Sequence, residues 1–371
     1  MKESDVKARL PEVEGRLAWF CSYVPEELIR SAGLRPYRAL PSKNNSRSTG
    51  FLPSNLCPYV RQAAERILKE ENESELRGAV VAHSCNAMMH LYNVLERETD
   101  LPVFLLDLPA AANSHAHKYM LSCLEKLADF LNKIGGEISH ASLLASIKIY
   151  ARTAKSLKLS VETEELSGFN FSDYLPGFIN FEMMRAAQTR KREKFNELLE
   201  NKGESVLDLP AEGAGVYILT GAQPHEEIVD LLSASKKGVF HEHCSGYRYW
   251  FKDYQGALKA VEGKGAKFED LKDRSRLLAF LTELYLEKPR CPRFYDDGYR
   301  ESFYGKLLEN LKINGVVFHN LNFCDFAHYD FLVIKKMMTE VNIPVLNFAT
   351  ELSSGDSGRI QTRLEAFMEM T

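Results

Sequence analysis

The sequence has 371 residues, which is long for one hydrophobic core and favours two or three domains. Hydrophobic residues make up 45% and charged residues 26%, and the formal net charge of −4 excludes the basic excess that is typical of nucleic-acid binding. The first residues are charged, and no run approaches the roughly 18 apolar residues that a membrane-spanning helix needs. We therefore expect a cytoplasmic protein that contacts neither nucleic acid nor membrane.

The first part of the chain predicts alternating strands and helices. Residues 15–24 predict a strand, residues 25–34 a helix and residues 35–40 a second strand. Cys57 stands directly before Pro58, and proline favours the first position of a helix. Cys57 is therefore expected at a helix N-terminus, where exposed amides and the helix dipole favour a thiolate.

Two later segments share one pattern, centred on Cys85 and Cys324. Residues 78–84 and 315–323 are mostly apolar and predict strands, and each leads into its cysteine, then a helix, then a strand that opens with an apolar residue and proline. The repeat predicts two α/β lobes of similar construction. A thiol that follows a strand lies where an open parallel sheet presents its ligand site, beyond the carboxyl ends of the strands.

The segment between the two units has a different character. Residues from about 114 to 203 contain helix-like stretches and little that predicts a strand. We interpret this part as a helical layer that links the lobes. The predicted organisation is an N-terminal Rossmann-like α/β lobe (1–135), a helical linking segment (136–205) and a C-terminal Rossmann-like α/β lobe (206–371).

The cysteines are the residues that suggest chemistry. Seven cysteines in a protein expected in the cytoplasm do not predict a disulfide framework, and a single cysteine is by default a small buried side chain. If the lobes face one another, Cys57, Cys85 and Cys324 converge on the crevice between them. Three thiolates suit a cubane iron-sulfur cluster, whose fourth iron then has a position for an external ligand. The spacing differs from the compact cysteine runs of ferredoxins, so spacing alone is a weak signal.

Several segments, in this order, resemble the 2-hydroxyacyl-CoA dehydratase family, which also contains subunits of benzoyl-CoA reductase. They are FCSYVPEELIRSAGLRPYR (20–38), NLCPYVR (55–61), AHSCNAM (82–88), HEHCSGYRYW (241–250), GVVFHNLNFCDF (315–326), IPVLNF (343–348) and RIQTRLEAFME (359–369). The resemblance implies two Rossmann-like lobes with parallel sheets plus helices, and an oxygen-sensitive 4Fe-4S cluster in the crevice between them. The family's cluster ligands carry over onto Cys57, Cys85 and Cys324, although Asn86 stands where the family often has Asp.

The resemblance also implies an activity, that of an anaerobic lyase with a radical mechanism. In that family an ATP-hydrolysing iron-sulfur activator supplies one electron at low potential, and the cluster passes it to an acyl-CoA thioester. The resulting ketyl radical permits the elimination of water. The implied partners are the acyl-CoA substrate, a homologous second dehydratase subunit and the activator. No GxGxxG or Walker motif is present, so ATP hydrolysis is expected of the activator.

Two alternatives stay open at this point. The chain could be a reductase-type relative, of the double-cubane-cluster or benzoyl-CoA reductase kind, because Cys21, Cys244 and Cys291 are available as further ligands. It could also be a structural homologue without a cluster. The sequence does not identify the acyl group, the oligomeric arrangement or the residue that moves the proton. Histidines near predicted strand ends or helix starts are expected to make ordinary hydrogen bonds; they are His83, His115, His319 and His328.

Overall fold

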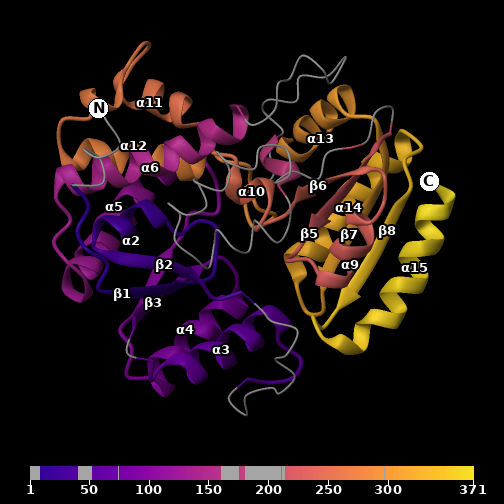
Figure 1. Ribbon diagram of the computed structural model, residues 1–371, viewed down its shortest axis with the longest axis horizontal. Coiled ribbons are helices and arrows are strands. Elements are labelled where there is room, and N and C mark those ends of the chain that lie inside the picture. The colour runs from indigo at the N-terminus through magenta and orange to yellow at the C-terminus, as the bar shows by residue number, and fades with distance from the viewer. Residues whose placement is uncertain are drawn as a thin grey trace.

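The computed structural model describes residues 9–40, 52–73, 75–159, 175–179, 210, 214–295 and 298–371. Within these residues the chain forms two parallel four-stranded β-sheets with accompanying helices (Figure 1). The predicted α/β class is therefore confirmed. Much of the predicted helical segment 136–205 lies outside the described residues, and the division into three segments stays a prediction.

The two sheets have the same strand order. The N-terminal sheet, in the order β2-β1-β3-β4, consists of β1 (Gly15–Trp19), β2 (Leu34–Arg38), β3 (Leu76–His83) and β4 (Val103–Asp107). The C-terminal sheet, in the order β6-β5-β7-β8, consists of β5 (Val216–Gly221), β6 (Gly238–Glu242), β7 (Ile313–Leu321) and β8 (Val345–Thr350). The internal repeat predicted around Cys85 and Cys324 is therefore present in the fold, since both cysteines follow the third strand of their sheet.

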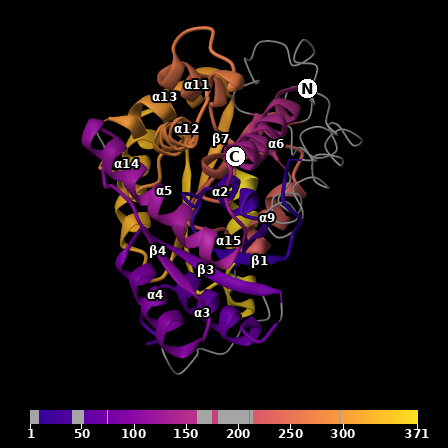
Figure 2. The same cartoon turned by 90° about the vertical axis from the view of Figure 1, so that its left-hand side faces the viewer.

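Helices cover both faces of the N-terminal sheet (Figures 1 and 2). On one face lie α3 (Pro58–Glu70) and α4 (Asn86–Glu98), and on the other lie α2 (Glu26–Ser31), α5 (Ser114–Ile134) and α6 (His140–Leu159). This double cover explains why the central strand β1 is buried along its whole length and carries apolar residues on both sides.

The C-terminal half supplies the remaining described helices. They are α9 (Glu226–Ser233), α10 (Tyr247–Trp250), α11 (Tyr254–Glu262), α12 (Arg274–Leu286), α13 (Tyr299–Asn310), α14 (Asp325–Glu340) and α15 (Ser357–Met370), with short 3₁₀ turns η4 (Phe268–Asp270) and η5 (Ser354–Asp356). A further 3₁₀ turn, η2 (Leu175–Phe178), precedes β5. Helices α9 and α15 pack against each other, and α13 packs against α14. Helix α12 instead packs against α5 and α6, so a segment that follows β6 in sequence covers the N-terminal lobe (Figure 2).

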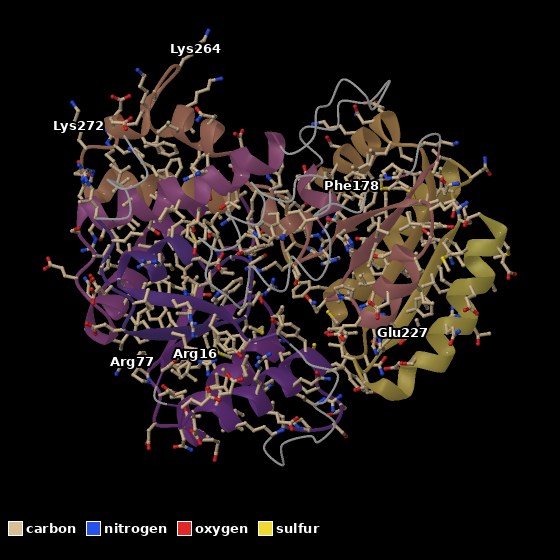
Figure 3. The ribbon with its side chains drawn as sticks, in the orientation of Figure 1. Arg16, Arg77, Phe178, Glu227, Lys264 and Lys272 are labelled. Atoms are coloured by element: carbon tan, nitrogen blue, oxygen red, sulfur yellow. The ribbon has the colours of Figure 1, made fainter. Side chains whose placement is uncertain are left out.

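The interior between these layers is apolar. Phe178 of η2 is fully buried and meets the ring of Phe240 on β6 edge-on, with ring centroids 5.4 Å apart. Figure 3 shows Phe178 within the protein, whereas Lys264 and Lys272, which lie between α11 and α12, point outward. Among the helices of the described ranges, none combines the length and apolar character needed to cross a membrane.

One buried carboxylate joins helix α2 to α11, α12 and the segment before α11. Glu27 on α2 is fully buried and accepts hydrogen bonds from the Tyr285 hydroxyl (2.6 Å), the Tyr254 hydroxyl (3.0 Å) and the Lys252 ammonium (3.3 Å). Burial alone would raise the pKa of Glu27, but the Lys252 charge and the phenol hydrogen bonds outweigh it and hold the pKa below its usual range. The carboxylate is therefore ionised inside the protein and depends on these partners.

Glu27→Ala is expected to lower the free energy of unfolding by about 3–5 kcal/mol, because the Lys252 ammonium then stays buried without its carboxylate. Urea unfolding followed by circular dichroism measures the change. Glu98→Ala, at an exposed position on α4, is the matched control and should change stability by less than about 0.5 kcal/mol. Equal stability of the two variants would contradict the structural role given to Glu27.

Candidate metal centre

The carboxyl ends of the two sheets meet at one cavity of about 150 Å³. In each sheet the second strand lies on one side of the first strand and the third strand lies on the other side. The direction in which successive strands are added to the sheet therefore changes next to the first strand. Open α/β sheets bind ligands at such a point, beyond the carboxyl ends of the first and third strands. The segments after β1, β3, β5 and β7 carry Cys21, Cys85, Gln223 and Cys324, and all four residues line the cavity. Both reversal points therefore contribute to the same site.

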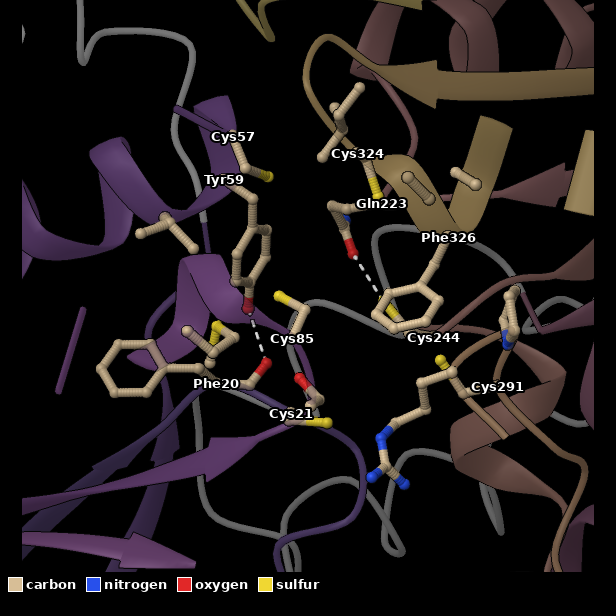
Figure 4. A pocket seen from close by; sticks show the side chains of 18 of the residues that line it. Phe20, Cys21, Cys57, Tyr59, Cys85, Gln223, Cys244, Cys291, Cys324 and Phe326 are labelled. Atoms are coloured by element: carbon tan, nitrogen blue, oxygen red, sulfur yellow. Dashed lines mark hydrogen bonds between the residues drawn. The ribbon is translucent and has the colours of Figure 1, made fainter. Parts of the chain in front are cut away.

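Six of the seven cysteines line this cavity, which we call the cysteine cavity. They are Cys21, Cys57, Cys85, Cys244, Cys291 and Cys324. None forms a disulfide, and Figure 4 shows their sulfur atoms around a common space. The seventh, Cys123, lies within α5 and does not line the cavity.

The three cysteines singled out from the sequence each occupy a helix N-cap. Cys57 precedes α3, Cys85 precedes α4 and Cys324 precedes α14. The backbone amides of the first helical turn act to lower the pKa of each thiol, as expected at a helix N-terminus, although burial has the larger, opposite effect. The structure brings the three residues together on one cavity, and their role as metal ligands stays a prediction.

Two unusual backbone conformations border the site. Gly221 ends β5 with φ of 100°, and a Cβ atom there would lie 2.3 Å from the His319 carbonyl oxygen, so glycine is required. Phe323 has φ of 62° although it is bulky, and it directly precedes Cys324. Strain of this kind persists only where the surrounding structure holds it, and here it lies in the turn that leads into Cys324.

The other three cysteines of the cavity are those that the sequence offered as further ligands for a reductase-type, double-cubane relative. Cys21 follows β1, Cys244 follows β6, and Cys291 lies between α12 and α13. The Cys291 amide lies 3.4 Å from the hydroxyl oxygen of Tyr23 and donates to it. All three line the same cavity as the first three cysteines, so the site has twice the number of thiols that one cubane with an open iron would use.

The thiols are too widely spread for a single metal ion. Across the described ranges, one group of candidate ligands has donor atoms that all lie within 4.8 Å of one another. It consists of His117, Glu283 and Glu287 and contains no cysteine. These residues do not line the cysteine cavity. The cysteine sulfurs thus surround a space and do not close on one point, which suits a group that contains several metal atoms.

Burial controls the protonation of the thiols. The cavity is walled largely by apolar side chains, and this burial raises the pKa of Cys57, Cys291 and Cys324 and raises the pKa of Cys85 to about 11. Near neutral pH these thiols are therefore protonated in the metal-free protein. Metal binding must displace their protons, because the thiolate is the ligand.

A buried guanidinium contacts one of the cysteines. Arg38, at the end of β2, is fully buried, and its Nη2 lies 3.5 Å from the Cys244 sulfur. Its Nη1 donates to the Cys244 carbonyl oxygen (3.1 Å) and to the Ser245 hydroxyl (3.0 Å). The same guanidinium lies over the Trp19 ring at 5.0 Å. Arg38 therefore brings positive charge from the N-terminal lobe to a thiol of the C-terminal lobe.

The residues present fit an iron-sulfur cluster. Cysteine thiolates are the usual protein ligands of such clusters, and six of them converge here in an apolar cavity. A cluster held by thiolates is an anionic group, and Arg38 supplies a cation beside it. The donor set and its surroundings are therefore compatible with the group that the sequence analysis expected.

Sequence reasoning missed two polar residues of the cavity. Gln223 accepts a hydrogen bond from the Ser245 hydroxyl and contacts the Cys244 sulfur, and Arg38 was not singled out at all. Both lie directly at or after carboxyl ends of strands, so the rule that selected Cys85 and Cys324 could have found them. Two of the expected histidines do make ordinary hydrogen bonds: His83 with Asp107 (3.1 Å) and His319 with Thr350 (2.8 Å).

Comparison with known proteins identifies relatives over nearly the whole chain. The family model for the 2-hydroxyglutaryl-CoA dehydratase D-component matches residues 21–371. The chain is 22% identical to the beta subunit of (R)-2-hydroxyglutaryl-CoA dehydratase from Acidaminococcus fermentans, with 96% of this chain and 93% of the relative covered. It is 21% identical to the (R)-phenyllactyl-CoA dehydratase beta subunit of Clostridium sporogenes (94% and 89% covered) and 19% identical to the lactoyl-CoA dehydratase beta subunit of Anaerotignum propionicum (94% and 89%).

The fold and the site define an α/β protein with a thiol-rich cavity between two parallel sheets. The chain belongs to the 2-hydroxyglutaryl-CoA dehydratase D-component family. The resemblance described from the sequence is confirmed, and so is the expectation of a dehydratase-type enzyme, at the level of the family.

In the metal-free protein, alkylation of Cys85 by iodoacetamide is expected to speed up with pH until about pH 11. The reason is that burial raises the pKa of Cys85 to about 11, so the reactive thiolate forms later than in a free cysteine with a pKa of about 8.5. Peptide mapping by mass spectrometry measures the rate. The same peptide in urea-unfolded protein is the control, and a folded-state rate that levels off near pH 8.5 would refute the burial effect.

Proposed function

We propose that this chain is the iron-sulfur subunit of a 2-hydroxyacyl-CoA dehydratase-like enzyme. The observation that carries the proposal is the convergence of six thiols on one apolar cavity between the two sheets. The relatives support the reaction class, because each is named as a subunit of an enzyme that dehydrates an acyl-CoA. In this proposal Cys57, Cys85 and Cys324 hold a 4Fe-4S cluster.

The chain's own residues would hold and shield that group. A bound cluster would supply one-electron chemistry at low potential, which the radical elimination of water from an acyl-CoA requires. Apolar side chains such as Phe20 and Met88 line the cavity and keep water out, which strengthens every charge interaction inside it. The helix N-termini behind Cys57, Cys85 and Cys324 stabilise negative charge on the sulfurs.

The proposal requires partners. The relatives are subunits of larger enzymes, so we infer a homologous second dehydratase subunit and an acyl-CoA substrate. We also infer an ATP-hydrolysing iron-sulfur activator as the source of the electron. The cytoplasmic location stays a prediction.

A second candidate is favoured by a specific observation. Cys21, Cys244 and Cys291 line the same cavity as the three ligands of the first proposal. Two joined cubanes that each use three cysteines would employ all six. The chain would then be a double-cubane-cluster protein or a benzoyl-CoA reductase-type subunit, with reductase activity in place of, or in addition to, dehydration.

Iron and acid-labile sulfide analysis after anaerobic purification tests the proposal. We expect at least about four irons per chain, lost on Cys57→Ala, Cys85→Ala or Cys324→Ala. About eight irons, with dependence also on Cys21, Cys244 and Cys291, would assign the double cluster. Cys123→Ala is the matched control and should retain its iron, since Cys123 lies away from the cavity. Absence of iron from wild-type protein after reconstitution would refute the cluster and leave the cluster-free homologue.

Arg38→Met is expected to lower the midpoint potential of the bound cluster by about 60 mV or more, which is about 1.4 kcal/mol for one electron. Removal of a buried positive charge favours the oxidised, less negative state. Potentiometric titration followed by EPR measures the change. Arg38→Lys keeps the charge and should shift the potential much less. An unchanged potential in Arg38→Met would disprove the electrostatic role.

A further inference from the structure

Helices α5 and α12 pack against each other, and three polar side chains meet where they do (Figure 2). His117 lies in the first turn of α5, whereas Glu283 and Glu287 lie at the end of α12. The Nε2 atom of His117 is 2.9 Å from a carboxylate oxygen of Glu283 and 3.8 Å from one of Glu287. We call these three residues the interhelix cluster, and none of them lines the cysteine cavity.

A backbone contact fixes which nitrogen of the His117 ring faces the carboxylates. The Nδ1 atom lies 2.8 Å from the carbonyl oxygen of Asn113. A carbonyl oxygen only accepts, so Nδ1 carries the hydrogen, and Nε2 of the neutral ring presents a lone pair to the two carboxylates. Lone pair and carboxylate oxygens repel one another unless a proton or a metal ion lies between them. Histidines that bind metals are held in this way, with the other ring nitrogen donating to a backbone carbonyl.

The end of α12 concentrates negative charge. Glu283 and Glu287 are four residues apart, so two like charges share one face at the negative end of the helix dipole, which is unfavourable on both counts. The last turn of α12 holds no basic residue, and in the described part of the chain the ion pairs of both carboxylates are those with His117. Lys288, the next residue, uses its ammonium for two hydrogen bonds deeper in the protein. A divalent cation would neutralise the pair of carboxylates.

The donor atoms suit a zinc ion. Bonds of about 2.0–2.1 Å from zinc to imidazole nitrogen and carboxylate oxygen place tetrahedral ligands about 3.3 Å apart. The observed separations of 2.9 Å and 3.8 Å lie on either side of this value. Magnesium and calcium take oxygen ligands, whereas the imidazole favours zinc or another divalent transition metal. The side chains are 29%, 24% and 49% exposed, so an ion can reach the cluster from solvent, and water can fill the fourth position.

We propose that His117, Glu283 and Glu287 bind one Zn²⁺ ion that ties the end of α12 to the start of α5. The role is structural, because the ion would join two helices that are more than 150 positions apart in sequence. The inference goes beyond the proposed function and does not depend on it, since the interhelix cluster shares no residue with the cysteine cavity.

The tie has a consequence for the segment that follows α12. Cys291, which lines the cysteine cavity, comes four residues after Glu287. Arg293 in the same segment already donates hydrogen bonds to two backbone carbonyls of the loop before α5 (2.9 Å and 3.0 Å). A zinc ion would hold this segment and α5 together at a second point, and so restrict the path by which the chain enters the cavity.

X-ray absorption at the zinc edge tests the proposal. Full-length protein is purified anaerobically with any cluster left in place, loaded with Zn²⁺ and freed of excess metal. We expect a zinc population with nitrogen and oxygen ligands at about 2.0–2.1 Å, amounting to about one ion per chain, whereas zinc on cysteine would show sulfur at about 2.3 Å. The ligand atoms therefore separate this site from the cysteine cavity, whether or not the cavity holds iron.

Variants of the interhelix cluster assign the ligands. His117→Ala and Glu283→Gln should each lower the zinc affinity of this population by at least about 100-fold, because loss of a group behind a ligand already costs about 10–100-fold. His115→Ala, at an exposed position on the same helix, is the matched control and should bind zinc like wild type. Zinc should raise the thermal midpoint of wild-type protein by about 3 °C or more beyond any rise in His117→Ala.

Three results would overturn the proposal. The first is zinc with sulfur ligands alone, or no retained zinc. The second is an unchanged affinity of the nitrogen- and oxygen-bound zinc in both variants. The third is a thermal midpoint that His117→Ala lowers equally with and without zinc, because a proton and not a metal would then lie between the imidazole and the carboxylates.

Discussion

The reversal of strand order in each sheet is the constraint on which the site depends. Parallel strands end at one edge, and in the order of these two sheets the segments after the first and third strands diverge and leave a crevice. Here the two crevices open onto one cavity, so segments from both halves of the chain place cysteines around it. The repeat thus gives the protein a site that neither lobe could form alone.

Buried polar contacts between the halves keep these sulfurs in position. Arg38 of the N-terminal lobe holds Cys244 and Ser245 of the C-terminal lobe, and Glu27 anchors Lys252, two residues beyond α10. A half-buried ion pair between Arg61 of α3 and Glu351 after β8 also joins the two halves. A buried charge that loses its partner destabilises the folded protein, so these contacts oppose separation of the two lobes. They therefore hold the cavity in one arrangement, as a cluster with ligands from both lobes would require.

The sequence predicted most of what local patterns determine. Cys57 before Pro58 indicated a helix N-terminus, and the parallel patterns at Cys85 and Cys324 indicated equivalent strand ends, as the structure has them. The position of Arg38 at a strand end could be predicted in the same way, but its contact with Cys244 could not, because these two residues are more than 200 positions apart in sequence. The packing of α12 on α5 and α6 likewise depends on tertiary contacts that periodicity does not encode.

The proposed function depends on an iron-sulfur cluster in the cysteine cavity. Anomalous diffraction at the iron absorption edge, from crystals grown and frozen anaerobically, would locate the iron atoms. We expect several iron peaks inside the cavity, within bonding distance of the sulfurs of Cys57, Cys85 and Cys324, and additional peaks near Cys21, Cys244 and Cys291 for the double cluster. An iron-free cavity in reconstituted protein, or iron bound only at His117, Glu283 and Glu287, would contradict it.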